Sequence, residues 1–327
     1  MIIAVDAAGG DYFPKNPVEG ALDALSEDSN LQILFVGPQD IITNELKNHS
    51  YDSDRVQIVD APEIIGMEES PASAVKNKRN SSITIGLSLH KAGKCDGFVS
   101  AGNTGALLAA STFILGKLQG VSRPTIASYY PTLKGFRLLV DAGANLEIKP
   151  EMAVQFAKMG QIFCKHIMGI EQPKIGLLNV GEEDEKGTEI TKSIHAELKK
   201  VEGFVGNIEG RDIFPAKADI FISDGMVGNI LLKFGESIPD ALMKMVGSAI
   251  QKSDLEANQI QSIQTVLKSA FSPFNYERVG GLPFLGVNGV SIVGHGGSSA
   301  LAIKNMIKSA VSCIESDING KIVASLN

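Results

Sequence analysis

The chain repeats one structural unit: a short run of strand-forming residues, a turn of small or polar residues, and then a helical stretch. The strand-forming runs before the six clearest turns are residues 2–5, 97–100, 136–140, 174–178, 219–223 and 290–293. Continuous runs of Val, Ile and Leu that alternate with helices are typical of a parallel sheet buried on both faces. The sequence therefore predicts an α/β fold with a mostly parallel, doubly wound sheet, an α/β/α sandwich.

Two segments depart from this repeat. Residues 125–130 and 136–140 are joined by a short connection, which predicts a β-hairpin and therefore an antiparallel pair of strands. Residues 236–271 hold two helical stretches with no strand between them, and apolar residues such as Leu242 and Leu267 recur at helical spacing. We expect a protruding helical hairpin that packs against a partner subunit or its own core, with contact to a membrane surface as the weaker alternative.

Length and composition limit the class of protein. The chain has 327 residues, and one core stops growing at roughly 250–300 residues. We therefore expect a single domain over residues 1–327, with space for two lobes that share a cleft. The 37 acidic and 30 basic side chains give a formal net charge of −7, which argues against a nucleic-acid partner. An acid at Asp6 interrupts any signal-peptide core, and the longest apolar stretch, 106–115, is too short to span a bilayer. These features predict a cytoplasmic protein.

Glycine-rich turns that follow strands are the first candidates for a binding site. Ligands of parallel sheets bind outside the carboxyl ends of the strands, so we expect all six turns to gather at that edge. Backbone N–H groups at a helix N-terminus bind anions, and glycines let a ligand approach them closely. The candidate phosphate- or substrate-binding residues are Asp6, Gly102, Asn103, Thr104, Gly105, Asn145, His295, Gly296, Ser298 and Ser299. For any one turn, the alternative is that its glycine or aspartate merely closes the turn.

The residue types at these turns favour a reaction without a protein nucleophile or a metal. The chain has no GxSxG elbow, and its 5 histidines and 3 cysteines lack the spacing of metal ligands. Inorganic phosphate can itself attack a thioester, because a thiolate leaves readily when the thiol pKa is about 8.5. Such an enzyme needs an anion cradle and oxyanion donors, for which Lys186 and Asn229 are further candidates. We expect neither a metal nor a cofactor.

Three further segments leave alternatives open. Residues 294–299 approach the GxGxxG dinucleotide fingerprint, but Ser299 occupies the third glycine position. The densest basic run consists of Lys76, Lys78 and Arg79, and it is either an exposed charged face or the docking site of an acidic carrier. Residues 271–285 form an aromatic loop broken by Gly and Pro, which predicts core packing, with an acyl-chain groove as the alternative.

Several of these segments together resemble the PlsX family of phosphate acyltransferases. The resembling stretches are residues 4–11, 78–82, 100–106, 141–145, 178–183, 206–212, 224–229 and 285–289. Any one of these stretches would be a weak match. The ordered series is specific because it covers essentially the whole chain.

The resemblance implies a fold similar to isopropylmalate dehydrogenase, found also in phosphate acetyltransferases. It implies reversible transfer of a long-chain fatty acyl group from acyl carrier protein to inorganic phosphate, which gives an acyl phosphate for phospholipid synthesis. It also implies a homodimer, loose association with the inner face of the membrane, and a membrane-bound acyltransferase as a further partner. Lys186 and Asn229 match positions proposed as catalytic in the family. Ala8 stands where many members have methionine, which leaves the acyl-chain preference open.

Three other functions fit the same residues less closely. A short-chain phosphate acetyltransferase would use acetyl-CoA as its acyl donor. A nicotinamide-dependent decarboxylating dehydrogenase would share the fold and transfer hydride with a hydroxy-diacid. A non-catalytic membrane-associated scaffold would depend on the helical hairpin and not on the turns.

Overall fold

The computed structural model describes residues 1–274, 277 and 279–326. Within these residues, 11 strands form one sheet in the order β3-β2-β1-β4-β11-β10-β5-β6-β9-β7-β8. The strands are β1 (Ile2–Asp6), β2 (Gln32–Gly37), β3 (Val56–Asp60), β4 (Gly97–Ser100), β5 (Thr125–Thr132), β6 (Gly135–Val140), β7 (Ile175–Leu178), β8 (Phe204–Ile208), β9 (Ile220–Ile222), β10 (Leu282–Leu285) and β11 (Val290–Val293). The helices are α1 (Lys15–Glu27), α2 (Gln39–Leu46), α3 (Pro71–Asn77), α4 (Ser82–Lys91), α5 (Thr104–Ala110), α6 (Pro150–His166), α7 (Glu189–Leu198), α8 (Gly225–Gln251), α9 (Ala257–Phe271), α10 (Ala300–Glu315) and α11 (Ile318–Leu326).

The sheet consists of two parallel blocks that point in opposite directions. Strands β3, β2, β1, β4 and β11 are parallel to one another, and so are β6, β9, β7 and β8. Strands β10 and β5 lie between the blocks, and the pairs β11–β10, β10–β5 and β5–β6 are all antiparallel. The predicted α/β class and the predicted β5–β6 hairpin are confirmed. The prediction that all six turns leave the same edge of the mostly parallel sheet is wrong, because the antiparallel pairs reverse the second block.

The register of the central strands nevertheless brings the two sets of turns face to face. Leu282, at the start of β10, pairs with the last residue of β11. Further along β10, Phe284 pairs with Ile126 of β5. The next residue of β5, Ala127, pairs with Val140 at the carboxyl end of β6. The carboxyl ends of the two blocks therefore meet at nearly the same level across β10 and β5.

Alternating strand residues pack against helices on both faces of the sheet. In β1, Ile3 and Val5 pack with apolar residues of α1 and α10, whereas Ala4 packs with those of α4 and α5. Helices α6, α7 and α11 cover the second block. The cluster that contains Ala4 continues through Ile126 to Phe221, so the two blocks share a buried core.

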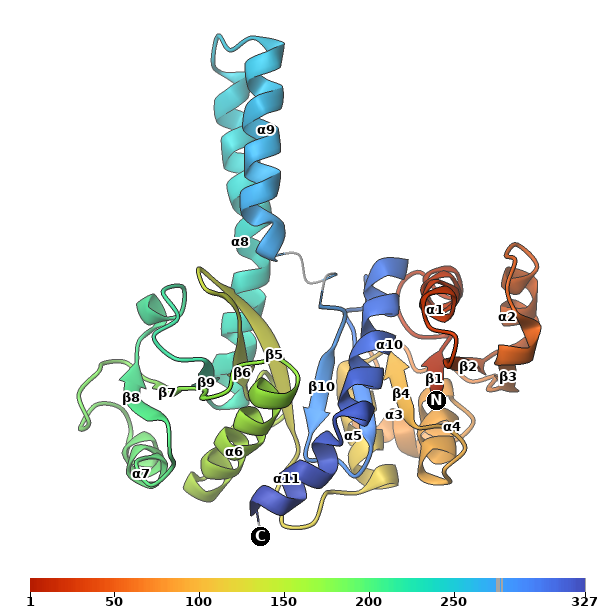
Figure 1. The fold of residues 1–327 in the computed structure, drawn as a ribbon, viewed down its shortest axis with the longest axis horizontal. Helices are drawn as coiled ribbons and strands as arrows, with labels where there is room; N and C mark the ends of the chain where they lie inside the picture. Colours follow the sequence, from red (N-terminus) through yellow and green to blue (C-terminus); the bar gives the residue numbers. More distant parts are fainter. Residues whose placement is uncertain (275–276, 278, 327) are drawn as a thin grey trace.

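Helices α8 and α9 form the predicted hairpin, which projects away from the body of the molecule (Figure 1). The first helix begins at Gly225 and not near Glu236, because Asp224 caps it. The Asp224 carboxylate accepts a hydrogen bond from the Val227 N–H at 2.7 Å. The glycine-rich turn expected here is therefore the first turn of a long helix. Across the part of the chain that the structure describes, no helix has the length and apolar character needed to cross a membrane.

Two elements near the C-terminal end differ from the sequence-based expectation. Residues 282–285 form strand β10 in the centre of the sheet and not part of an aromatic loop. The strand is short and contains Pro283, which lacks the N–H that a central strand normally donates, so its sequence reads as a loop. Helix α11 follows α10 as a second closing helix. Residues 275, 276 and 278 of the expected loop lie outside the described residues.

Candidate active site

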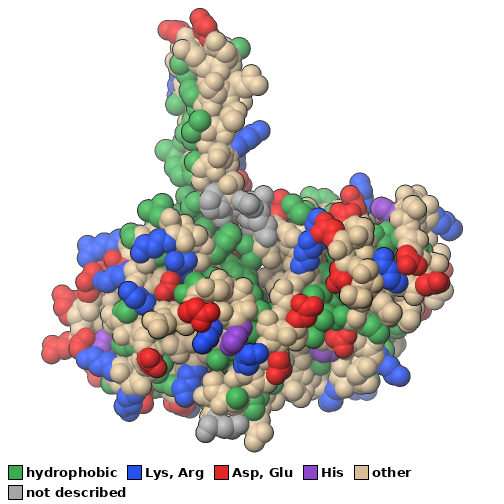
Figure 2. Space-filling model, viewed as in Figure 1, with side chains coloured by type: hydrophobic (Ala, Val, Ile, Leu, Met, Phe, Trp, Pro, Cys, Tyr) green, Lys and Arg blue, Asp and Glu red, His purple; other side chains and the backbone are tan. Residues whose placement is uncertain are grey.

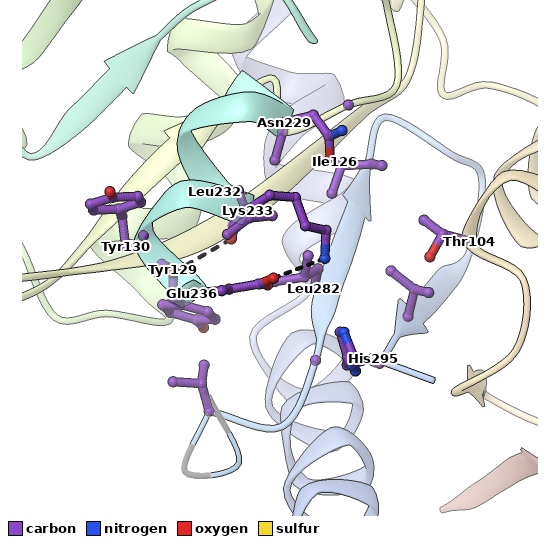
Figure 3. Close-up of a pocket in the computed structure, with 18 of the residues that line it drawn as sticks. Thr104, Ile126, Tyr129, Tyr130, Asn229, Leu232, Lys233, Glu236, Leu282 and His295 are labelled. Atoms are coloured by element: carbon purple, nitrogen blue, oxygen red, sulfur yellow. Dashed lines mark hydrogen bonds and ion pairs between the residues drawn. The ribbon is translucent and has the colours of Figure 1, made fainter. Parts of the chain in front are cut away.

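A cavity of about 350 Å³ lies where the carboxyl ends of the two blocks meet. Helix α5 and the turn after β11 line it from one block, and α8 and the turn after β6 line it from the other, with β5 and β10 between them (Figure 3). Its apolar wall includes Ile126, Tyr129, Phe136, Leu232, Phe274 and Leu282. Its polar side chains include Thr104, Asn229, Lys233, Glu236 and His295. An apolar wall beside a few polar groups is typical of a ligand-binding site.

The turn after β6 is built around the buried carboxylate of Asp141. This carboxylate accepts hydrogen bonds from the Gly143 and Ala144 N–H groups at 3.1 and 2.9 Å. It also accepts from the backbone and side-chain N–H groups of Asn145 at 2.7 and 2.8 Å. The Asn145 side chain donates further to the Pro124 carbonyl oxygen. Asn145, a predicted substrate-binding residue, therefore holds the turn, while Gly143 lines the cavity.

Helix α8 presents a polar stripe to the cavity. Its first member, Asn229, lies beside Gly143. A Cβ atom added to Gly143 would lie 3.5 Å from the side-chain oxygen of Asn229. Lys233 and Glu236 follow at helical spacing, and the Lys233 Nζ–Glu236 Oε2 distance is 2.8 Å. Sequence motifs alone do not single out Lys233 or Glu236. Their spacing from Asn229 is the one signal that points to them.

The turn after β11 places His295 at the cavity. The Gly297 N–H donates to His295 Nδ1 at 3.1 Å, so a neutral ring carries its proton on Nε2. Ser298 is buried and its hydroxyl donates to the His295 carbonyl oxygen, while Ser299 caps α10. The carbonyl oxygen of Gly296 accepts a backbone hydrogen bond from the turn after β1. Among the described residues, no cluster of three or more His, Cys, Asp or Glu side chains is arranged to hold a metal ion.

Asn103 clamps the loop 66–69 onto the N-terminus of α5. Its side-chain nitrogen donates to the carbonyl oxygens of Gly66, Met67 and Glu69 at 3.1, 3.0 and 3.2 Å. Its side-chain oxygen caps the helix by accepting a backbone N–H. Both ends of the amide are therefore engaged within the protein. The residues of this predicted phosphate-binding turn that line the cavity are Thr104 and Gly105.

Asp6 supports the same turn from within the core. It is 2% exposed, and its carboxylate accepts the Ser100 hydroxyl at 2.6 Å and the Ala8 N–H at 3.1 Å. The Ser100 oxygen accepts the Gly102 N–H at 3.0 Å. Burial raises the pKa of Asp6, and the hydrogen bond from Ser100 opposes that rise. Asp6 and Gly102 thus stabilise the turn, and the described lining of the cavity does not include them.

The structure does not bring Lys186 to the cavity. Lys186 lies in the exposed loop between β7 and α7, where its carbonyl oxygen accepts the Asn179 side-chain N–H at 3.1 Å. The side chain of Asn207 tethers the same loop by donating to the Glu183 carbonyl oxygen at 2.8 Å. The described lining of the cavity contains Asn229 but not Lys186.

The predicted carrier-docking run divides into two kinds of residue. Lys78 Nζ donates to the Ile64 carbonyl oxygen at 2.7 Å and to Glu69 Oε1 at 2.5 Å. The hydrogen bond from Lys78 lowers the pKa of the Glu69 carboxyl, so Lys78 braces the loop that Asn103 clamps. Lys76 and Arg79 are exposed at the end of α3 and just beyond it.

A sequence profile of the family described as "Fatty acid synthesis protein" matches residues 1–321. The phosphate acyltransferase of Chlorobaculum parvum is 48% identical over 339 residues, which covers 100% of this chain and 99% of the relative. That of Halothermothrix orenii is 41% identical over 330 residues, again covering 100% of this chain and 99% of the relative. The chain belongs to the PlsX family of phosphate acyltransferases. The resemblance to PlsX that the sequence motifs indicate is confirmed.

Solved structures share the fold of this PlsX-family chain at low identity. A phosphotransacetylase from Streptococcus pyogenes has a TM-score of 0.61 and 16% identity, covering 96% of this chain and 94% of that chain. A branched-chain phosphotransacylase from Enterococcus faecalis V583 has a TM-score of 0.58 and 15% identity, with coverage of 95% and 99%. A 4-hydroxythreonine-4-phosphate dehydrogenase from Klebsiella pneumoniae has a TM-score of 0.51 and 13% identity, with coverage of 96% and 97%. These likenesses concern the fold alone, and they confirm the predicted α/β sandwich.

Proposed function

We propose that this PlsX-family protein reversibly transfers a long-chain fatty acyl group from acyl carrier protein to inorganic phosphate. The product is an acyl phosphate for phospholipid synthesis. The observation that carries the proposal is the make-up of the cavity, in which an apolar wall stands beside Thr104, Asn229 and His295. An acyl chain would pack against the apolar wall, and phosphate would bind to the polar side chains. Membership of the PlsX family supports the same reaction class.

The proposed reaction needs no protein nucleophile. A phosphate oxygen attacks the thioester carbonyl carbon, so that a C–O bond forms and the C–S bond breaks. The carrier thiolate leaves and takes up the proton that the attacking phosphate loses. Negative charge develops on the carbonyl oxygen, and a preorganised N–H donor at that oxygen accelerates the reaction. We propose the Asn229 amide as one donor and Lys186 as a second, which requires the loop between β7 and α7 to close over the cavity.

We also propose that residues 1–327 act as one domain whose two lobes share this cavity, which the core cluster common to both blocks supports. The acidic carrier would dock on Lys76 and Arg79, because both are exposed cations on the block that carries α5. Lys78 would contribute indirectly, by bracing the loop 66–69 through Glu69.

The helical hairpin is the proposed interface of a homodimer. Exposed apolar side chains recur along α8, namely Met226, Ile230, Phe234 and Met245, which are 60%, 60%, 63% and 67% exposed. Figure 2 shows hydrophobic side chains gathered along one side of the hairpin and at its base. An apolar face of this extent favours a partner surface. The part that a second copy leaves uncovered would hold the protein at the inner face of the membrane, beside a membrane-bound acyltransferase that consumes the product.

A phosphate-dependent assay tests the proposed function. Purified protein is mixed with long-chain acyl carrier protein, and free carrier thiol and acyl phosphate are measured with and without phosphate. Both should appear only when phosphate is present. Turnover of acetyl-CoA in place of the carrier would identify a short-chain phosphate acetyltransferase, and hydride transfer with a hydroxy-diacid would identify a dehydrogenase. Intact dimers that bind lipid and turn over no donor would indicate a scaffold.

A further inference from the structure

Lys233 extends from α8 into the cavity, towards the side formed by Thr104 and His295 (Figure 3). Among the described residues that line the cavity, it is the only lysine or arginine. Any anion that enters this part of the site therefore meets the Lys233 ammonium. The walls on either side are largely apolar, so the described lining gives an entering anion few other polar partners.

The Lys233 ammonium is already paired within the protein. Its Nζ lies 2.8 Å from Glu236 Oε2, three residues further along the same helix. The side chain of Lys233 is 55% exposed and that of Glu236 is 31% exposed, so a small anion from solution can reach the pair. Ion pairs with this degree of exposure contribute little stability, because water competes for both partners. A phosphate dianion, which carries more charge than one carboxylate, can therefore replace Glu236 as the partner of the ammonium.

We propose that Lys233 is the phosphate-binding cation of this site and that Glu236 is its internal competitor. The inference rests on the proposed acyl transfer to phosphate and names the residue that receives the phosphate group. In the empty site, Glu236 neutralises Lys233 and keeps it extended along the cavity. When phosphate arrives, it takes the ammonium, and the Glu236 carboxylate turns away from it. Two sources share this chemistry, free inorganic phosphate and the phosphodiester of the carrier's prosthetic arm, and we assign Lys233 to the first.

Three variants test the assignment in the full-length protein: Lys233→Met, Glu236→Gln, and Lys244→Met as a matched control. Lys244 lies on the same helix, is exposed, and does not line the cavity. Loss of a hydrogen bond to a charged group predicts a KM for inorganic phosphate at least about tenfold higher in Lys233→Met. The KM for the acyl donor should stay within about twofold of the wild-type value. Glu236→Gln should lower the KM for phosphate by about two- to fivefold, because it removes a weak competitor. Lys244→Met should change neither constant.

Equilibrium dialysis with radiolabelled inorganic phosphate, in the absence of any acyl donor, provides a readout that does not depend on turnover. Binding should weaken in Lys233→Met, tighten in Glu236→Gln, and recover in Lys233→Arg, which keeps the charge. If circular dichroism shows that Lys233→Met does not fold, the test rests on phosphate binding by Lys233→Arg and Glu236→Gln.

Three outcomes would overturn the inference, and a fourth concerns the function instead. Unchanged phosphate binding in folded Lys233→Met removes the assignment. Lys233→Met could instead raise only the KM for the acyl carrier protein, and not the KM for an acyl donor that lacks the phosphodiester. That result would show that Lys233 binds the phosphodiester of the carrier's prosthetic arm and not inorganic phosphate. Weaker phosphate binding in Glu236→Gln makes Glu236 a positioning residue and not a competitor. Wild-type protein that binds phosphate through Lys233 but transfers no acyl group leaves the inference standing while the proposed function fails.

Discussion

The backbone of Gly228 in α8 lies directly against the carbonyl oxygen of Asp141, with no space between them for a Cβ atom. Asp141 is the residue whose carboxylate organises the turn after β6. Gly228 immediately precedes Asn229, which faces Gly143 across the cavity wall. The position of the Asn229 amide therefore depends on a glycine that carries no functional group of its own.

Replacing Gly228 with alanine should displace the base of α8. The added methyl group would overlap the Asp141 carbonyl oxygen, and overpacking of this kind typically costs about 1–3 kcal/mol. We expect a lower free energy of unfolding in a denaturant titration and reduced turnover. Gly247→Ala is the matched control, because nothing lies within 4 Å of a Cβ at that position. It should raise the free energy of unfolding by up to about 1 kcal/mol, since alanine favours a helix over glycine. Equal stability of the two variants would contradict the close packing.

Asn229→Ala should lower kcat by about 10²–10³, the usual loss when one oxyanion donor is removed. Its KM for phosphate should change far less, which separates this role from that of Lys233. The free energy of unfolding should stay close to that of the wild type, because the side chain lies at the cavity surface. Steady-state kinetics with long-chain acyl carrier protein measure both constants. A folded variant with wild-type kcat would remove Asn229 from the mechanism.

Lys186→Ala should also lower kcat, but by less than Asn229→Ala. Lys186 lies outside the described cavity lining, so its contribution depends on closure of the loop that Asn207 tethers through the Glu183 carbonyl oxygen. The same kinetic assay compares the two variants. Wild-type turnover in Lys186→Ala would show that Lys186 is not an oxyanion donor in the reaction.

Charge reversal of Lys76 and Arg79 should raise the KM for acyl carrier protein and leave that for inorganic phosphate unchanged. Both side chains are exposed, so the effect should fade as salt screens the attraction. Measuring the KM for the carrier at several salt concentrations checks this. An unchanged KM at low salt would place the carrier elsewhere.

Lys78→Met should act first on stability, and on carrier affinity only indirectly through the loop 66–69 that Lys78 braces. The hydrogen bond from Lys78 lowers the pKa of Glu69 from its usual 4.5. A carboxyl with a lowered pKa stabilises the fold at pH values above 4.5, and this contribution is lost as the pH falls through the lowered value. The difference in Tm between wild type and Lys78→Met should therefore be largest near neutral pH and should shrink below pH 4.5. A difference in Tm that grows as the pH falls would contradict the ion pair between Lys78 and Glu69.

Met245→Glu should weaken the proposed homodimer. Met245 is 67% exposed on α8, and a charge there would have to be desolvated if a second copy covers it. Light scattering coupled to size-exclusion chromatography should show a shift towards monomer. Gln261→Glu adds a charge at an exposed polar position of α9 and serves as the control. If both variants keep the wild-type mass, the dimer does not use this face.

Local patterns in the sequence determined the element types and the class of fold. Strand runs, turn glycines and helical spacing are read within a few residues, because φ/ψ preferences and side-chain periodicity act over that range. They were sufficient to predict the alternating α/β units, the β5–β6 hairpin and the α8–α9 hairpin. The ordered series of motifs was sufficient for the PlsX family, since it samples nearly the whole chain.

Only the tertiary structure decided how the two blocks meet and which polar groups reach the cavity. The direction of the second block depends on β10. This strand is short and contains Pro283, so its sequence predicts a loop. Asn103 and Asn145 resemble ligand-binding residues in the sequence, yet their amides are engaged by the carbonyl oxygens of Gly66 and Pro124. A polar side chain takes whichever partner the fold places within hydrogen-bond distance, and segments far apart in the chain supply those partners. The sequence lists the candidate groups, but long-range packing determines which of them are left to face a substrate.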